Sequence, residues 1–342
     1  MLFRICLTVF IAAAGAVHAE IISVHGSPLT AQVMKLAEPI LKEEFGLELR
    51  IATEGGAVGG YLAVGSETAQ LGMTLKEIEP SERAHFPARA FDEVQIGWQV
   101  LGIGVARNVW DGGVRTLTRE QMVKIYEGDI RNWKELGGPD AAIKFYNPKR
   151  GRGTWELLVT WLYKDQRLAP LGEQFETVVR YEDARDSVEF NESSISVMPP
   201  QMANGESIRI LGIKEADGSS MDPSPAMLVS KKYPLAKPLM ILAGRRLAGD
   251  PKRVVDFLLS PRGQAIVKSV GFVPVSETAA AAEAAANAAS DASRKRAAAL
   301  DAFEFLSPAV IRVSIGVMSF LFVIILLRMI LRYRAIRRAK QR

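Results

Sequence analysis

Apolar and polar residues alternate in two patterns along residues 20–275, and together these patterns predict an α/β protein. Apolar residues at steps of three and four predict a helix over Pro28–Glu44. The short apolar runs on either side of it, Ile21–Val24 and Leu47–Ala52, predict strands. A longer apolar stretch, Val94–Ala106, predicts a strand that crosses between two lobes.

The rest of this region continues the alternation of strands and helices. The further strands that we predict are Ala69–Met73, Ile143–Tyr146, Ile208–Ile213 and Ala226–Val229. The further helices are a short one from Gly56 through Leu62, and Leu117–Tyr126, Thr154–Tyr163, Lys252–Leu259 and Gly263–Val270. One of them begins with a capping box, since Thr118 stands at its N-cap and Gln121 follows three positions later.

The N-terminal residues 1–19 have the pattern of a secretory signal peptide. Arg4 precedes the apolar stretch Ile5–Val17, and Val17 with Ala19 gives the small residues expected before a cut at Glu20. An uncleaved N-terminal anchor is the alternative. The only cysteine of the chain lies inside this segment, so the exported protein would have no disulfide and would depend on its core for stability.

A second apolar segment, residues 307–331, predicts a transmembrane helix. Val313–Leu327 carries no charge, and twenty residues at about 1.5 Å each span the hydrocarbon core of roughly 30 Å. Seven basic residues follow from Arg328 onward, so the tail 332–342 is expected in the cytoplasm. We therefore expect a single-pass protein of the inner (cytoplasmic) membrane whose main domain lies in the periplasm.

An alanine-rich linker, residues 276–306, separates the main domain from this segment. Thirteen of the twenty-one residues in Ala279–Ala299 are alanine, the best helix former, and charged residues keep the segment soluble. Without large apolar residues it builds no core of its own. It is expected to be a partly helical spacer, and a helix that binds a partner protein is the alternative.

Charge and residue types exclude several classes of function. The net charge is +5, but the basic residues gather in the C-terminal tail and residues 20–275 are slightly acidic. No basic stripe remains for a nucleic acid. The exported part has two histidines, His25 and His85, without metal-ligand spacing, and no pair of nucleophile and base is visible. We expect neither an enzyme nor a bound metal or cofactor.

Three small-residue loops each connect a strand directly to a helix. They are His25–Ser27, Glu54–Ala57 and Lys149–Thr154. Glycine lets several backbone N–H groups turn toward one point, and the helix N-terminus adds partial positive charge, so such loops suit anions. None of them has the glycine spacing of a P-loop or a dinucleotide-binding motif.

Several segments together resemble the phosphate-binding proteins of ABC transporters. The specific match is Ile125–Gly138, which reads IYEGDIRNWKELGG, and the supporting matches are Val24–Ser27, Arg152–Thr154, Gly263–Val267 and Gly271–Pro274. The resemblance covers about residues 21–275. It implies a two-lobed type II periplasmic-binding-protein fold with a two-strand hinge. Lobe 1 would hold residues 20–98 and 225–275, and lobe 2 residues 99–224.

The resemblance also implies an oxyanion site in the three loops. The ligand-binding candidates carried over by position are Ser27, Leu29, Gly56, Ala57, Thr74, Arg150, Arg152, Gly153 and Thr154. Gly153 and Thr154 match the family, but Pro28 has no N–H, Ala57 lacks a hydroxyl, and Arg152 replaces a serine.

Two positions of the family's site lose a charged side chain in this chain. Pro148 stands where the family has an arginine, whose charge Lys149, Arg150 or Arg152 could replace. Leu75 stands where the best-known members have a carboxylate that accepts the proton of hydrogen phosphate. Without such an acceptor, discrimination against sulfate should weaken, unless Glu54 or Glu77 supplies one.

The function that follows is capture of phosphate or a related small oxyanion, for uptake or for sensing. The implied partners are the anion, the inner membrane, and an ABC permease or another membrane protein. The alternative is a membrane-tethered sensor or adaptor with a diverged pocket and no transport role. The identity of the anion, the oligomeric state and the partner of the tail stay open.

Overall fold

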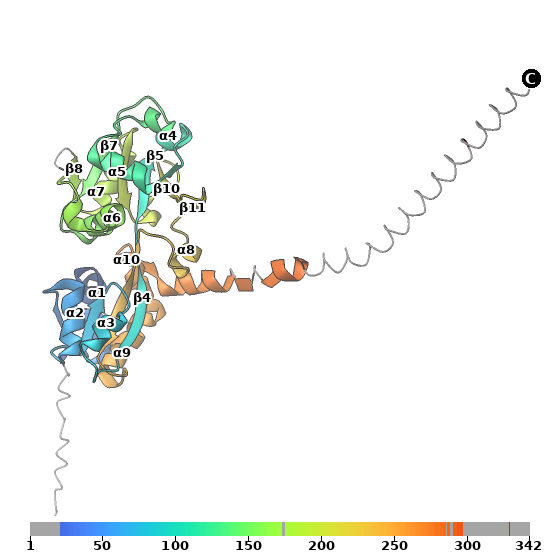
Figure 1. Ribbon diagram of the computed structural model, residues 1–342. Coiled ribbons are helices and arrows are strands. Elements are labelled where there is room, and N and C mark those ends of the chain that lie inside the picture. The colour runs from blue at the N-terminus through green and yellow to red at the C-terminus, as the bar shows by residue number, and fades with distance from the viewer. Residues whose placement is uncertain (1–20, 173–174, 285, 288–289, 297–327, 329–342) are drawn as a thin grey trace, which may run out of the picture. The chain divides into compact units, whose positions relative to one another are not determined.

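The computed structural model describes residues 21–172, 175–284, 286–287, 290–296 and 328 (Figure 1). The chain divides into two compact units, Met1–Ala281 and Ala282–Arg342. The first unit contains both β-sheets, each with helices packed against it.

Lobe 1 is built on a six-stranded sheet in the order β13-β4-β12-β3-β1-β2. Its strands are β1 (Ile21–Gly26), β2 (Glu48–Ala52), β3 (Leu71–Thr74), β4 (Asp92–Val100), β12 (Ala236–Ala243) and β13 (Val273–Pro274). Its helices are α1 (Pro28–Phe45), α2 (Gly56–Gly65), α3 (Pro80–Ala84), α9 (Gly249–Leu259) and α10 (Pro261–Ser269). Because β1 runs parallel to β2 and β3, the loops that follow these strands meet at one edge of the sheet.

Lobe 2 has a second sheet, in the order β11-β10-β5-β9-β7-β8, with β6 beside β10. Its strands are β5 (Gly102–Ala106), β6 (Thr116–Leu117), β7 (Lys144–Pro148), β8 (Glu176–Val178), β9 (Ser194–Met198), β10 (Ile208–Lys214) and β11 (Ser220–Met221). Its helices are α4 (Arg107–Asp111), α5 (Arg119–Glu127), α6 (Gly153–Tyr163), α7 (Tyr181–Glu189) and α8 (Pro225–Val229), with 3₁₀ turns η1 (Trp133–Leu136), η2 (Gln166–Leu168) and η3 (Pro200–Met202). The parallel strands β7, β8 and β9 again end at one edge.

Two antiparallel strands form the hinge between the lobes. The chain leaves lobe 1 along β4 and enters lobe 2 along β5, with only Leu101 between them. It returns along β12, in which Ala236 pairs with Val100. The predicted crossing over Val94–Ala106 is therefore confirmed.

The return crossing lies about ten residues later than we predicted. Leu228, Tyr233 and Leu235 are buried in the core of lobe 2, so the segment before Ala236 packs with that lobe although we assigned residues 225–275 to lobe 1. The predicted strand Ala226–Val229 is also wrong. It is the helix α8, because Ser224 precedes it and Pro225 occupies the first helical position.

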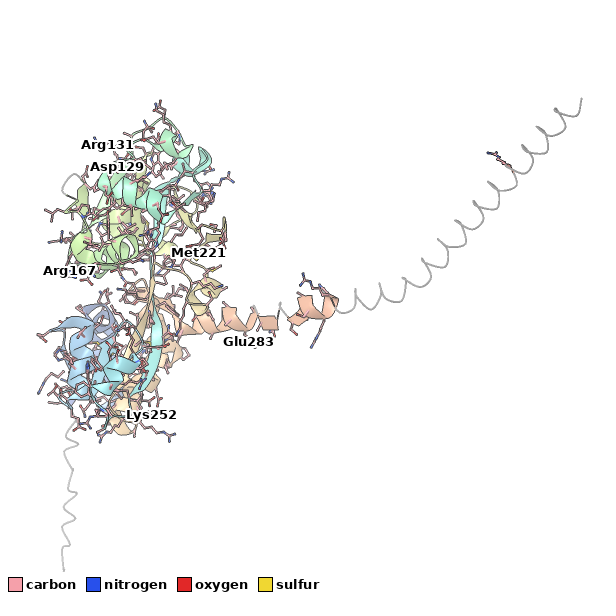
Figure 2. All side chains as sticks on the ribbon, viewed as in Figure 1. Asp129, Arg131, Arg167, Met221, Lys252 and Glu283 are labelled. Carbon is pink, nitrogen blue, oxygen red and sulfur yellow. The ribbon has the colours of Figure 1, made fainter. Side chains whose placement is uncertain are left out.

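The family-like segment Ile125–Gly138 serves the fold of lobe 2. Trp133 is fully buried, and its indole N–H donates to Ser193 O at 2.8 Å. The Asn132 side chain accepts from Lys134 N and caps the turn η1. Asp129 and Arg131 of the same segment are exposed (Figure 2).

The segment after residue 274 is helical at residues 275–284, 286–287 and 290–296. In the described part of the chain, no helix combines the length and the apolar character needed to cross a bilayer. The predicted signal peptide, residues 1–19, and the predicted span 307–331, apart from Arg328, lie outside the described residues.

Candidate anion-binding site

The first loop places the N-terminus of α1 at the edge of lobe 1 where β1 and β3 end. Ser27 is fully buried, and its backbone N–H donates to Met73 O at 2.8 Å. Its Oγ accepts from Thr30 N at 3.4 Å, which leaves its own proton to donate. Pro28 has no N–H, so the amide of Leu29 is the first donor of this helix without a helical partner.

Glycines hold the second loop against the first. Gly26 has φ +137°, and a Cβ built there would lie 2.2 Å from Met73 O. A Cβ on Gly60 would lie 2.7 Å from His25 O, so α2 packs directly on the backbone of β1 and β3. The His25 ring nitrogen Nε2 lies 2.6 Å from Glu54 O and connects the two loops. These glycines therefore serve close packing as well as the turn.

The second loop presents backbone groups alone. Gly55 and Gly56 both adopt positive φ, and α2 begins without a side-chain cap. Because helix geometry gives the amide of Ala57 no intrahelical partner, this N–H is available to a ligand. The loss of a hydroxyl at Ala57 has no substitute in the loop.

The third loop brings the N-terminus of α6 to the corresponding edge of lobe 2. Arg152 is the N-cap residue, and its side chain makes no capping bond and has no ion pair among the described residues. The Arg150 side chain is engaged in another contact, because its guanidinium lies over the Trp155 ring, 4.9 Å from the ring centroid. Of these two arginines, Arg152 is therefore the better placed to replace the missing charge.

The first turn of α1 touches the third loop across the space between the lobes. A Cβ on Gly153 would lie 2.6 Å from Cδ1 of Leu29. The N-termini of α1 and α6 are thus neighbours, although 124 positions separate Leu29 from Gly153. Both termini carry partial positive charge, which favours an anion between them.

Sequence and structure comparisons place the chain in a family. The model of the PBP superfamily domain matches residues 12–262. The chain belongs to the PBP superfamily. Among curated relatives, the phosphate-binding protein PstS of Borreliella burgdorferi is 26% identical over 47% of this chain and 59% of that protein. The phosphate-binding protein PstS of Bacillus subtilis is 25% identical over 73% of this chain and 79% of that protein.

Solved structures agree on the fold. An ABC-type phosphate transport receptor from Vibrio cholerae is similar with a TM-score of 0.60 and 21% identity, over 74% of this chain and 99% of that one. A possible phosphate binding protein from Planctomyces limnophilus has a TM-score of 0.65 and 19% identity, over 79% and 99% of the two chains. The resemblance to phosphate-binding proteins and the two-lobed α/β fold predicted from the sequence are confirmed.

Lobe 2 of this PBP-superfamily chain contributes residues to the candidate site that the sequence analysis missed. A small pocket lies where β7, β8 and β9 end, at the N-termini of α6 and α7. Polar side chains of Lys149, Arg152, Thr154, Arg180 and Tyr181 line it. Arg180 is paired with Asp183, Nη2 to Oδ1 at 2.6 Å, and this contact lowers the pKa of Asp183.

The end of β3 offers little to a ligand. Thr74 is buried, and its hydroxyl donates to Lys76 O at 3.0 Å. Leu75 packs against the core of lobe 1. Glu77, one of the two carboxylates considered as a proton acceptor, is ion-paired with Lys231 at 2.5 Å. Glu54 is exposed, and its backbone oxygen is the partner of His25.

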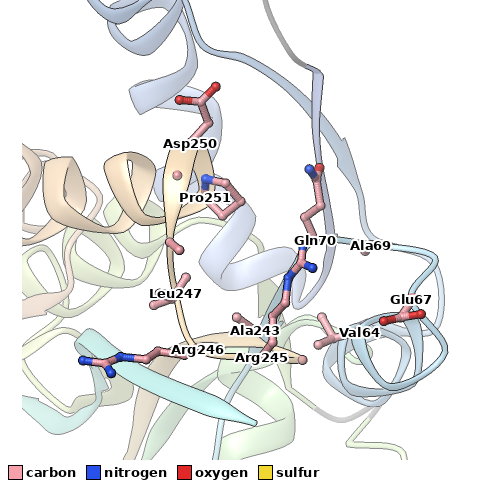
Figure 3. Close-up of a pocket in the computed structure, with 13 residues that line it drawn as sticks. Val64, Glu67, Ala69, Gln70, Ala243, Arg245, Arg246, Leu247, Asp250 and Pro251 are labelled. Carbon is pink, nitrogen blue, oxygen red and sulfur yellow. The ribbon is translucent and has the colours of Figure 1, made fainter. Parts of the chain in front are cut away.

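A larger pocket of about 590 Å³ lies elsewhere on lobe 1 (Figure 3). It lies where β12 ends and α9 begins. The segment from Ala243 to Pro251 lines one side of it, and Val64 and Gln70 line the other. Because β12 runs antiparallel to β3, this pocket is at the other end of the sheet from the first and second loops. Its arginines, Arg245 and Arg246, are exposed.

Proposed function

We propose that the two-lobed domain captures phosphate, or a related small oxyanion, between its lobes and performs no chemistry on it. The observation that carries the proposal is the contact between Leu29 and Gly153, which brings the positive ends of α1 and α6 together. Arg152, at the same point, adds a cation without a protein partner among the described residues. The relatives named as phosphate-binding proteins support this choice of anion.

Binding would act through the hinge. An anion that accepts hydrogen bonds from both helix N-termini has more partners when the lobes are close than when they are apart. It would therefore favour the closed arrangement by its difference in affinity for the two states. The two strands β4 and β12 are the elements that must bend.

The test is a titration of the full chain, purified in mild detergent, with phosphate, sulfate and molybdate. Calorimetry should show saturable binding of phosphate. At a phosphate concentration of ~100 times Kd, the stability should rise by about 2.7 kcal/mol, which differential scanning fluorimetry detects. The proposal is refuted if none of the three anions produces binding heat or a thermal shift.

We further propose that residues 307–331 anchor the domain to the inner membrane, with residues 1–19 directing export. The uncharged stretch Val313–Leu327 and the seven basic residues from Arg328 onward support this topology. The chain should stay in the membrane pellet after extraction with alkaline carbonate. Protease added to spheroplasts should remove the domain and spare the tail. Release of the intact chain by carbonate would contradict the anchor.

A second candidate function is a tethered sensor or adaptor without a transport role. Pro28, Ala57 and Leu75 favour it, because each removes a group with which the family holds its ligand. Transport requires a permease as partner, whereas sensing does not. If the full chain binds phosphate but cells lacking it take up phosphate at the normal rate, the sensor is the better assignment.

A further inference from the structure

The turn between α10 and β13 belongs to lobe 1 and touches lobe 2. Gln201 of the turn η3, in lobe 2, donates from its Nε2 to Gly271 O at 2.7 Å. A Cβ built on Gly271 would lie 3.8 Å from Cδ2 of Tyr181. Tyr181 also lines the pocket that contains Arg152. One side chain, that of Tyr181, therefore borders both this turn and the candidate site.

The short strand β13, which follows the turn, is attached to the hinge. Val273 and Pro274 pair with Trp98 and Gly97 of the hinge strand β4. Val273 also packs against the apolar cluster in which Trp98 continues into the core of lobe 2. A bend of β4 therefore acts on β13 directly.

A helix begins directly after β13, and its first turn is tied to the same hinge strand. Residues 275–284 are helical. Gln264 of α10 is only 4% exposed, and its Oε1 accepts from Ser276 N at 3.3 Å. Its Nε2 donates to Ile96 O of β4 at 3.0 Å. A buried amide thus joins the hinge strand to the start of this helix.

The contacts between this turn and lobe 2 depend on how close the lobes are. The bond from Gln201 to Gly271 and the contact with Tyr181 are lost when the lobes separate at the hinge. The turn then keeps only its partners in lobe 1, and a segment with fewer contacts opens locally more often. An anion that favours the closed arrangement would therefore also order the turn and the helix start that follows it.

We propose that residues 271–278, the coupling segment, transmit capture of the anion to the helix that leads into the alanine-rich linker. The segment becomes more ordered when the lobes close and less ordered when they open. Because the linker continues toward the predicted membrane span, the protein gains a route by which an occupied site is sensed at the membrane. This inference rests on the proposed function.

The test measures amide hydrogen exchange of the full chain in mild detergent, with and without a saturating concentration of phosphate. Phosphate should slow exchange in the coupling segment about two- to tenfold, the range that corresponds to one hydrogen bond. Gln201→Met keeps the length of the side chain and removes the donor to Gly271. In this variant the slowing should be at most about half as large, and phosphate binding should weaken about two- to tenfold because the closed arrangement loses a bond.

The matched control is Gln166→Met. Gln166 also lies in lobe 2, and its Nε2 donates to Thr160 Oγ1 at 3.4 Å within that lobe. This variant should keep the phosphate affinity and the exchange response of the parent chain. Because Gln201 is exposed, its replacement should leave the fold intact, and thermal unfolding without phosphate checks this.

The outcomes separate the two proposals. If calorimetry shows no binding of phosphate, sulfate or molybdate to the parent chain, the proposed function fails and the coupling fails with it. If the parent binds phosphate but exchange in the coupling segment is unchanged, the coupling is refuted and the proposed function stands. Equal slowing in the parent and in Gln201→Met also overturns the inference, because the contact with Gly271 then transmits nothing. If Gln201→Met fails to fold, the response of the parent chain decides alone.

Discussion

Replacing Gly26 by alanine is expected to lower the free energy of unfolding by more than about 3 kcal/mol. With φ at +137°, Gly26 has a backbone conformation that residues with a side chain rarely adopt. The new Cβ would lie 2.2 Å from Met73 O, 2.9 Å from Met73 N and 3.0 Å from Gly60 Cα. All three are backbone atoms of β3 and α2, so the strand or the helix itself must move.

Urea unfolding of the full chain measures the effect, and Gly46→Ala is the matched control. Gly46 also has positive φ, +67°, but a Cβ there meets no atom within 4 Å. Its replacement should cost only about 1–2 kcal/mol, the price of the left-handed conformation. Equal losses of unfolding free energy in the two variants would mean that the packing of α2 on β1 relaxes easily. The first loop, with Ser27, would then lack the rigid support that we describe.

The elements predicted from the sequence are those with strong local signals. The helix α1 has an apolar stripe, a serine cap and a terminal glycine, and Gly46 adopts the left-handed conformation expected of it. The capping box at Thr118 is confirmed by the bonds of Thr118 and Gln121. In both helices the local sequence and the packing favour the same structure, so the prediction needs no tertiary information.

The elements that were missed have weak local signals. The helix α7 buries only Ala184 and Val188, so its sequence reads as a polar loop. The strand β12 contains Pro238, which argues against a strand between two neighbours, yet β12 lies between β3 and β4. A change of register between Leu239 and Met240 accompanies it. Tertiary packing overrides local preference in both cases.

The residues of the candidate site were likewise predicted only where the local sequence carries a signal. Its loops were predicted because a strand end, small residues and a helix start are all local features. Arg180 and Tyr181 carry no such pattern, since they come to the site only through the packing of α7. The sequence also left open which cation replaces the lost arginine, and the stacking of Arg150 on Trp155 favours Arg152 over Arg150.

Reversing the charge of Arg152 should weaken phosphate binding by a hundredfold or more. Arg152→Glu removes a charge-assisted donor worth roughly 1.5–3 kcal/mol and places a carboxylate where the anion would lie. Each 1.4 kcal/mol is a tenfold change in Kd, so loss and repulsion together exceed about 2.8 kcal/mol. The fold should survive, because an acidic residue at a helix N-terminus is favourable. Calorimetry of the full chain measures the affinity, and thermal unfolding without phosphate checks the stability.

Arg167→Glu provides the matched control for this reversal. Arg167 lies on the surface of lobe 2 (Figure 2), where its side chain is 88% exposed and paired with Asp165. Both variants change the net charge equally, so any general electrostatic attraction falls by a similar amount in each. A selective loss with Arg152→Glu therefore requires a local contact with the anion. Equal losses of phosphate affinity in the two variants would mean that Arg152 acts only through the net charge of the protein. In that case Arg152→Ser, which restores the hydroxyl found in the family, should strengthen binding rather than weaken it.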